Sequence, residues 1–273
     1  MPLLLILCGF VAYRCPPYVF MWALCASMFF GAKLYTLRRI AESTPLHERL
    51  IYAIAWVGMD VGSFLAPRRP LLVHRREWLT AGARLLLGVS LTWLVARHVA
   101  DPVVAAWTGM IGLLLVLHFG LFHLLALAWR ARGRAVQPLM DRPLRSRSLA
   151  ELWGVRWNRG FHQLAHRLVF RPLSRRISPA LALLLTFAAS GLVHDLIISL
   201  PARGGFGLPT LYFMIQGLGV LAERRLPRSD ALRRAFTFIV ALAPLPALFH
   251  PPFIHNVIVP FLQVVGAMGK ELP

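Results

Sequence analysis

Cysteine is scarce in this 273-residue chain. Its three cysteines, Cys8, Cys15 and Cys25, lie near the start, without Cys-x-x-Cys spacing or matched histidines. This pattern argues against a disulfide scaffold or a structural zinc site, so we interpret the thiols as small buried hydrophobes. The motifs of soluble enzymes are also absent, since the sequence contains no Gly-x-Ser-x-Gly, His-Glu-x-x-His, P-loop or dinucleotide-binding glycine pattern.

Acidic residues are few as well. Against 30 Lys and Arg there are 11 Asp and Glu, which gives a formal net charge of +19, although charged residues make up only 15% of the chain and hydrophobic residues 58%. A chain both hydrophobic and basic is ordinary in a bilayer, where basic loops hold apolar spans in place. The composition therefore predicts a polytopic membrane protein. Nucleic-acid binding is not expected, because the basic residues lie between apolar spans rather than on a soluble face.

Apolar runs predict about eight transmembrane helices, since a helical crossing needs about 20 mainly apolar residues. They fall at roughly 2–13, 17–36, 78–96, 103–129, 179–200, 206–222, 235–249 and 253–268. The further apolar stretch 50–66 is interrupted by Gly58, Asp60 and Gly62 and has basic residues on both sides. We predict that it is re-entrant or interfacial, with Asp60 capping a broken helix or pairing with a buried arginine.

The basic residues predict an orientation. The loops assigned to the cytoplasm are 37–49, 67–77, 130–178 and 223–234. Only Arg14, Arg97 and Arg203 then lie outside and Arg84 lies within a span, while the other 26 basic residues lie on or at the cytoplasmic side. We therefore expect one integral membrane domain over 1–273 with both termini cytoplasmic. Frequent Arg and Ala point to a bacterial cytoplasmic membrane.

The long basic segment contains a helical pattern. From Leu149 to Leu168 the apolar side of the wheel carries tryptophans and leucines, and arginines gather on the other side. Such a helix is expected to lie in the membrane interface on the cytoplasmic side. Asn158 falls inside the apolar sector, where an amide is costly unless it is hydrogen-bonded. Either it bonds a neighbouring backbone group or it faces a pocket.

Ionisable groups within membrane spans are functional candidates by default. His118 and His123 lie about 140° apart on a helix, so they cannot chelate one metal from one face, and we expect structural hydrogen bonding instead. His194 is about 15 residues, or roughly 22 Å, into its span. Asp195 points about 100° away from it, whereas Ser190 shares its face and is placed to orient it.

These groups suit acyl transfer to a lipid. A neutral buried histidine is the form that a general base needs, and His194 would take the proton of a hydroxyl as its oxygen attacks an activated carbonyl. An amide such as that of Asn158 would hold the donor or steady the developing oxyanion. The cytoplasmic arginines would draw an anionic, phosphate-bearing donor to the membrane.

Two segments resemble a known family. Residues 148–158, read as Ser-Leu-Ala-Glu-Leu-Trp-Gly-Val-Arg-Trp-Asn, resemble the Trp-Gly-Arg-Arg-Trp-Asn segment of the wax synthase-like branch of the membrane-bound O-acyltransferase superfamily. Residues 190–196, Ser-Gly-Leu-Val-His-Asp-Leu, are similar to its Ser-Gly-Leu-x-His-Glu-Leu segment. The resemblance covers about 50–225. Asp195 replaces the usual Glu, and Val155 interrupts the Arg-Arg pair.

The resemblance implies an all-α bundle enclosing a tunnel, with acyl-CoA as donor substrate, a lipid alcohol as acceptor, membrane lipids around it, and neither cofactor nor metal. It places catalysis at His194 and Asn158. The residues expected to bind substrate are Trp153, Arg156, Trp157, Arg159, Ser190 and Asp195. Two alternatives stay open. One is the same chemistry on a glycan or a protein, and the other is a transporter that uses His194 and Asp195 as a proton relay.

Overall fold

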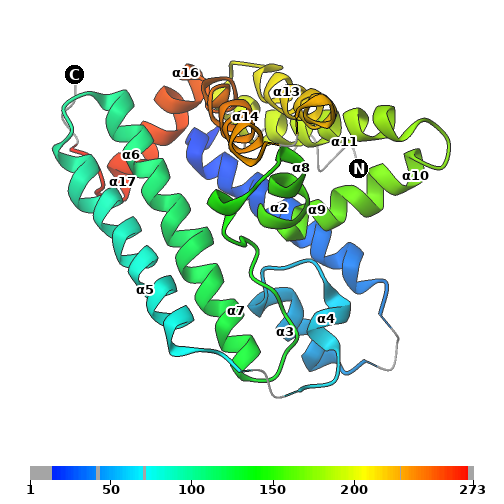
Figure 1. Ribbon diagram of the computed structural model, residues 1–273. Coiled ribbons are helices and arrows are strands. Elements are labelled where there is room, and N and C mark those ends of the chain that lie inside the picture. The colour runs from blue at the N-terminus through cyan, green and yellow to red at the C-terminus, as the bar shows by residue number, and fades with distance from the viewer. Residues whose placement is uncertain (1–13, 41–43, 70–71, 228, 270–273) are drawn as a thin grey trace.

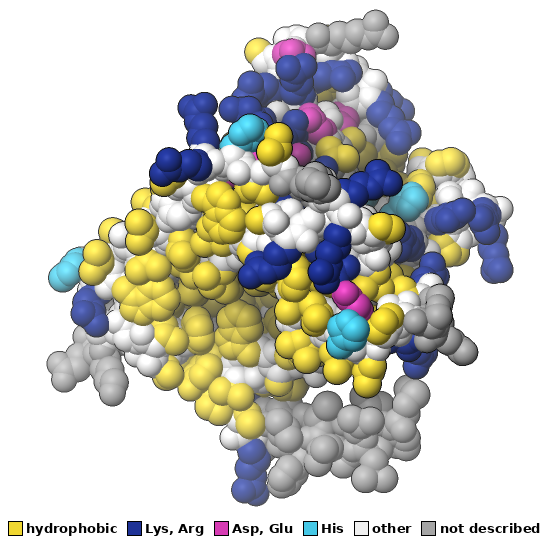
Figure 2. Space-filling view, turned by 90° about the horizontal axis from the view of Figure 1, so that it is seen from below, with side chains coloured by type: hydrophobic (Ala, Val, Ile, Leu, Met, Phe, Trp, Pro, Cys, Tyr) yellow, Lys and Arg dark blue, Asp and Glu magenta, His cyan; other side chains and the backbone are white. Residues whose placement is uncertain are grey.

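The computed structural model describes residues 14–40, 44–69, 72–227 and 229–269. Within these ranges the chain is largely helical and contains no strand, which confirms the all-α prediction (Figure 1). The predicted span over 2–13, together with Cys8, lies outside the described residues. Seen from the side of α3 (Leu46–Ala55) and α4 (Val61–Leu65), Lys and Arg side chains lie around a broad hydrophobic surface, as Figure 2 shows.

Five helical runs are long and apolar enough to cross a membrane. They are Pro17–Leu37, Arg75–His98, Pro102–Ala131, Pro179–Ala202 and Asp230–Leu248. Each matches one of the eight predicted spans. The first run is the single helix α2 (Pro17–Leu37), and the second is α5 (Arg75–Val89) with a short extension to His98. Each of the other three runs contains two α-helices. These are α6 (Pro102–Leu114) and α7 (Phe122–Ala131), α11 (Pro179–His194) and α12 (Leu200–Ala202), and α14 (Asp230–Leu242) and α15 (Leu245–Leu248).

A sixth run, α13 (Leu208–Ala222), corresponds to the predicted span 206–222 but has only 15 residues. We call the end of the bundle near α3 and α4 the basic end, and the end that carries the turns 99–101 and 203–207 the opposite end. The start of α13 contacts Asp195, and Glu223, directly after the helix, contacts Leu149 at the start of α8. The short helix therefore connects the end of the run Pro179–Ala202 with the tryptophan segment.

The last predicted span, 253–268, is wrong. This segment forms α16 (Pro251–Phe253), η9 (Ile254–Ile258) and α17 (Val259–Val264). Asn256 donates to the Ala202 carbonyl at 2.9 Å, and Arg97 donates to the Gly266 carbonyl at 2.8 Å. Ala202 and Arg97 each lie at the end of a long helical run, at the opposite end of the bundle. The segment therefore lies across that end. Its apolar length suggested a crossing, but prolines and packing on α6 keep it there.

The segment 50–66 is a broken helix, because α3 ends at the extended Trp56 and α4 begins at Val61, and its re-entrant or interfacial placement stays a prediction. Lys33, near the end of α2, is buried and donates to the carbonyls of Tyr52 and Gly58 at 3.1 and 2.6 Å. Asp60 caps α4, because its carboxylate accepts the Ser63 N–H at 3.2 Å and the Ser63 hydroxyl at 2.6 Å. Of the two roles predicted for Asp60, the structure shows helix capping.

Candidate active site

The tryptophan segment is not one continuous helix. Leu149 begins a helical stretch made of α8 (Leu149–Glu151) and η5 (Leu152–Arg156), but Trp157 is extended at φ −107°, ψ 123° and Asn158 is left-handed at φ 44°. The N–H of Arg159 then donates to the Leu139 carbonyl at 3.0 Å. The predicted amphipathic helix from Leu149 to Leu168 is therefore broken in its middle. Asparagine fits this position because it adopts the left-handed conformation more readily than most residues.

After the break the chain continues as α9 (Arg159–Ala165), η6 (His166–Phe170) and α10 (Arg171–Leu173), which project to one side of the bundle (Figure 1). Asn158 precedes α9, yet its side chain does not cap the helix. Its backbone N–H approaches Met140 Sδ at 3.3 Å, and its carbonyl accepts from the His162 N–H at 3.0 Å. The backbone at Asn158 thus shapes the turn between η5 and α9, and its catalytic role stays a prediction.

A distant carboxylate holds the start of this segment. Glu223, at the end of α13, accepts the backbone N–H groups of Leu149 and Ala150 at 2.6 and 2.9 Å. Ser148 Oγ accepts the Glu151 N–H at 3.0 Å, so the first turn of α8 is capped twice. A carboxylate is favourable at a helix N-terminus, where N–H groups lack intrahelical partners. Sequence reasoning missed Glu223, because only the fold brings it to α8.

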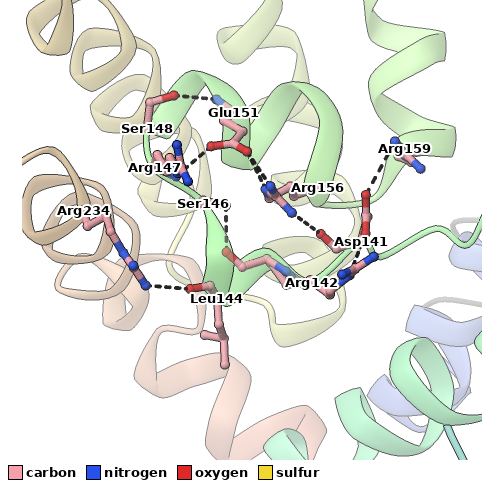
Figure 3. A network of polar contacts seen from close by, with 11 residues as sticks. Asp141, Arg142, Leu144, Ser146, Arg147, Ser148, Glu151, Arg156, Arg159 and Arg234 are labelled. Atoms are coloured by element: carbon pink, nitrogen blue, oxygen red, sulfur yellow. Dashed lines mark hydrogen bonds and ion pairs between the residues drawn. The ribbon is translucent and has the colours of Figure 1, made fainter. Parts of the chain in front are cut away.

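Arginines around the segment form a polar network (Figure 3). Arg156 donates to Glu151 Oε1 at 2.7 Å and to the Asp141 carbonyl at 3.1 Å, while Arg159 lies 3.8 Å from the Asp141 carboxylate. Burial acts to raise the pKa of Glu151, but the Arg147 N–H and the Arg156 guanidinium outweigh it, so this pKa lies below its usual value. Arg156 is thus engaged within the protein, and its role in binding substrate stays a prediction.

Aromatic rings connect this segment with the histidine motif. The Trp153 ring contacts Phe213 at 5.7 Å, and Phe213 contacts the imidazole of His194 at 4.3 Å between centroids. The Trp153 indole N–H donates to Gln216 Oε1 at 3.3 Å. Further rings within 6.5 Å of Trp153 are Trp157, Phe187 and Tyr212. The structure therefore brings Trp153, Trp157 and His194 to one aromatic cluster, with Phe213 between the two motifs.

The orientation of His194 identifies its free nitrogen. Its Nδ1 lies 2.7 Å from the Ser190 carbonyl oxygen, which can only accept a hydrogen bond. In the neutral ring Nδ1 therefore carries the proton, and Nε2 keeps its lone pair. The Ser190 hydroxyl donates instead to the Thr186 carbonyl at 3.0 Å. Ser190 was predicted to orient His194 and does so through its backbone rather than its side chain.

Asp195 faces away from His194 and stabilises the start of α13. Its Oδ1 accepts the Gly207 N–H at 2.8 Å and the Ser199 hydroxyl at 2.9 Å, and its Oδ2 accepts the Thr210 N–H at 3.1 Å and also the Thr210 hydroxyl. Gly207 and Thr210 frame the first turn of α13, so Asp195 caps that helix. These contacts agree with the prediction that Asp195 does not orient His194. The substrate-binding role predicted for Asp195 has no support in them.

A buried histidine extends this cap. His250 lies 3.1 Å through Nε2 from Ser199 Oγ, and its Nδ1 accepts the Phe253 N–H at 3.2 Å. Gly205, at φ +71°, lies against the imidazole, where a Cβ atom would collide with the ring. Burial lowers the pKa of His250, although the charge of Asp195 acts in the opposite direction. Sequence reasoning did not predict this cluster, because His250 lies 51 residues from Ser199 along the chain.

Two further histidines of the membrane spans, His118 and His123, each have a ring nitrogen without a hydrogen-bond partner among the described residues. Nδ1 of His118 and Nδ1 of His123 are both buried without a hydrogen-bond partner in the described part of the chain. Structural hydrogen bonding of the two histidines was predicted, and their Nδ1 atoms do not support it. The His118 ring instead contacts the Phe122 ring at 5.4 Å. Among the described residues, no group of three or more His, Cys, Asp or Glu side chains could hold a metal ion.

A cavity of about 290 Å³ opens at the basic end, between the 56–63 turn and α9. Its polar lining side chains are Asp60, Ser63, Gln137, Arg159, His162 and Gln163. Burial lowers the pKa of His162, and the neighbouring His166 acts in the same direction. Of the predicted substrate-binding residues, Arg159 lines this cavity. His194 and Asn158 do not.

The chain is similar to one known family. A sequence model of the membrane bound O-acyl transferase family matches residues 136–215. The matched segment contains both predicted motifs, from the loop before α8 to the middle of α13. No curated protein matches the chain. The match supports membership of the membrane-bound O-acyltransferase superfamily.

Proposed function

We propose that this protein is an integral membrane O-acyltransferase that transfers an acyl group from acyl-CoA to the hydroxyl of a lipid-like alcohol, as in the synthesis of a wax ester or a related neutral lipid. One observation carries the proposal. The bond between His194 Nδ1 and the Ser190 carbonyl leaves Nε2 with a lone pair, deep in a membrane span. A general base needs such a nitrogen. The family match over 136–215 supports O-acyl transfer in general.

In this mechanism His194 Nε2 takes the proton of the acceptor hydroxyl while its oxygen bonds to the thioester carbonyl carbon. The carbon–sulfur bond of the tetrahedral intermediate then breaks, and the CoA thiolate receives the proton back from the imidazolium. The ester and free CoA leave, and the histidine returns to its neutral form. The Ser190 carbonyl keeps Nδ1 protonated throughout, and it also stabilises the imidazolium that forms.

Other residues would position the two substrates. Trp153 and Trp157 provide apolar surface near His194 through Phe213. We assign to Asn158, at the turn beside them, a role in positioning the donor or steadying the oxyanion. The cavity at the basic end, with Arg159 and His162 in its wall, would receive an anionic part of acyl-CoA. In this arrangement the basic end faces the cytoplasm of a bacterial cell.

Product identification tests the function. The full-length protein is expressed in a host without neutral-lipid synthases, membranes are incubated with labelled acyl-CoA, and products are identified by mass spectrometry. We expect a neutral lipid ester that depends on the protein. A soluble acylated product would assign the same chemistry to a glycan or protein acceptor, whereas solute flux without consumption of acyl-CoA would favour a transporter.

Arg159→Gln should raise the KM for acyl-CoA about tenfold, which corresponds to about 1.4 kcal/mol, with little change in kcat. The substitution removes a guanidinium from the wall of the cavity while keeping a polar side chain. Arg175→Gln is the matched control, because Arg175 is exposed beyond α10 and does not line the cavity. Equal KM values for the two variants would show that Arg159 does not bind acyl-CoA directly. The basic residues would then act only on membrane topology or through general electrostatic attraction.

A further inference from the structure

The chain after η5 forms an arm, made of α9, η6 and α10 and covering 159–173, which projects to one side of the bundle (Figure 1). One side of the arm faces the protein, because Gly160 and Leu164 are buried. The other side carries Phe161 and Leu168, whose side chains are 42% and 48% exposed. The outer surface of the arm is therefore partly apolar.

The outer surface of the arm also carries positive charge. Arg167 and Arg171 are exposed, and no Asp or Glu occurs in the sequence between Glu151 and Asp195. Among the described residues, neither arginine forms an ion pair with a carboxylate. A guanidinium recognises phosphate oxygens with two parallel hydrogen bonds. The two arginines therefore favour an anion that comes from outside the protein.

The helix that follows places the arm at the membrane surface. Shortly after α10 the apolar run Pro179–Ala202 begins, which is long enough to cross a membrane. Ser178 caps the start of this run, since its Oγ accepts the Leu181 N–H at 3.3 Å. Leu181 and Leu185 are 46% and 41% exposed, so a lipid-facing surface begins where the arm ends. The arm therefore lies at the level of the lipid head groups.

We propose that the arm is a binding surface for anionic phospholipids of the adjacent leaflet. Arg167 and Arg171 hold the negatively charged head groups, while the two exposed apolar side chains enter the acyl-chain region beside them. A position in the interface alone would need no particular head group, whereas two arginines without acidic partners select a negative one. The assignment holds whichever reaction the protein catalyses.

Hydrogen–deuterium exchange of the arm tests this binding. The purified full-length protein is placed in nanodiscs of dioleoyl phosphatidylcholine, with or without dioleoyl phosphatidylglycerol, and exchange is followed in peptides that cover 159–173. We expect the anionic lipid to slow exchange at least about fivefold, the contribution of one arginine near an anionic surface. High salt should remove this difference, because it screens the charges. Arg167→Gln/Arg171→Gln should also remove it, whereas Arg167→Lys/Arg171→Lys, which keeps both charges, should retain most of it.

The matched control removes two arginines from the same end of the bundle. Arg38 and Arg75 are exposed and lie outside the arm, so Arg38→Gln/Arg75→Gln should preserve the slower exchange of the arm. An equal loss in the arm pair and the control pair would show only general attraction by the basic end, and would overturn the proposal. Equal exchange in the two lipid compositions would do the same. Free coenzyme A that slows exchange as strongly in phosphatidylcholine alone would assign the two arginines to the acyl donor instead.

Discussion

His194→Ala should lower acyl transfer from labelled acyl-CoA by about 100-fold to 10,000-fold, the range of a lost general base. The variant loses Nε2, the nitrogen that the bond to the Ser190 carbonyl leaves with a lone pair. His194→Gln should be equally inactive, because it restores bulk and polarity but no basic nitrogen. Rescue by glutamine would assign His194 a structural role.

The control for this experiment is another histidine of a membrane span. His123→Ala removes an imidazole whose Nδ1 is buried without a hydrogen-bond partner in the described part of the chain. It should keep activity within a few-fold of the unaltered protein. Equal amounts of each variant in the membrane fraction and equal thermal unfolding would show that the loss is chemical. Full activity of His194→Ala would remove the basis of the proposed mechanism.

Hydrophobic periodicity and length predicted the long helices well. The runs at 17–36, 78–96, 103–129, 179–200 and 235–249 are all present, because a membrane span is determined mainly by its own composition. Segment 253–268 has the same composition, yet it lies across one end of the bundle, where Arg97 and Asn256 hold it. Such contacts depend on the complete fold and leave no local pattern in the sequence.

The candidate site was predictable where a motif identified residue types, but not where long-range contacts determine their orientation. His194, Trp153 and Trp157 do lie around one aromatic cluster. The prediction of one amphipathic helix from Leu149 to Leu168, however, required a continuous helix. The left-handed backbone of Asn158 interrupts it. Glu223 and Phe213, which hold or connect the two motifs, lie outside both, so no spacing rule indicates them.

Asp195→Ala should destabilise the protein by on the order of 2–3 kcal/mol and lower activity as a consequence. The carboxylate accepts from the Gly207 N–H and from the N–H and hydroxyl of Thr210, so its removal leaves the first turn of α13 without its cap. That helix carries Phe213, which contacts His194 at 4.3 Å. Loss of the cap should therefore loosen the contact between the aromatic cluster and the base.

Thermal unfolding in detergent, measured together with acyl transfer, separates this role from a proton relay. Asp195→Asn keeps one carbonyl oxygen as an acceptor and should recover part of both quantities, and Thr210→Val should reproduce part of the loss by removing one donor. In a relay between His194 and Asp195, the asparagine variant would be inactive at unchanged unfolding temperature. Since the Asp195 oxygens face α13 and Ser199, we expect activity to follow stability across the three variants.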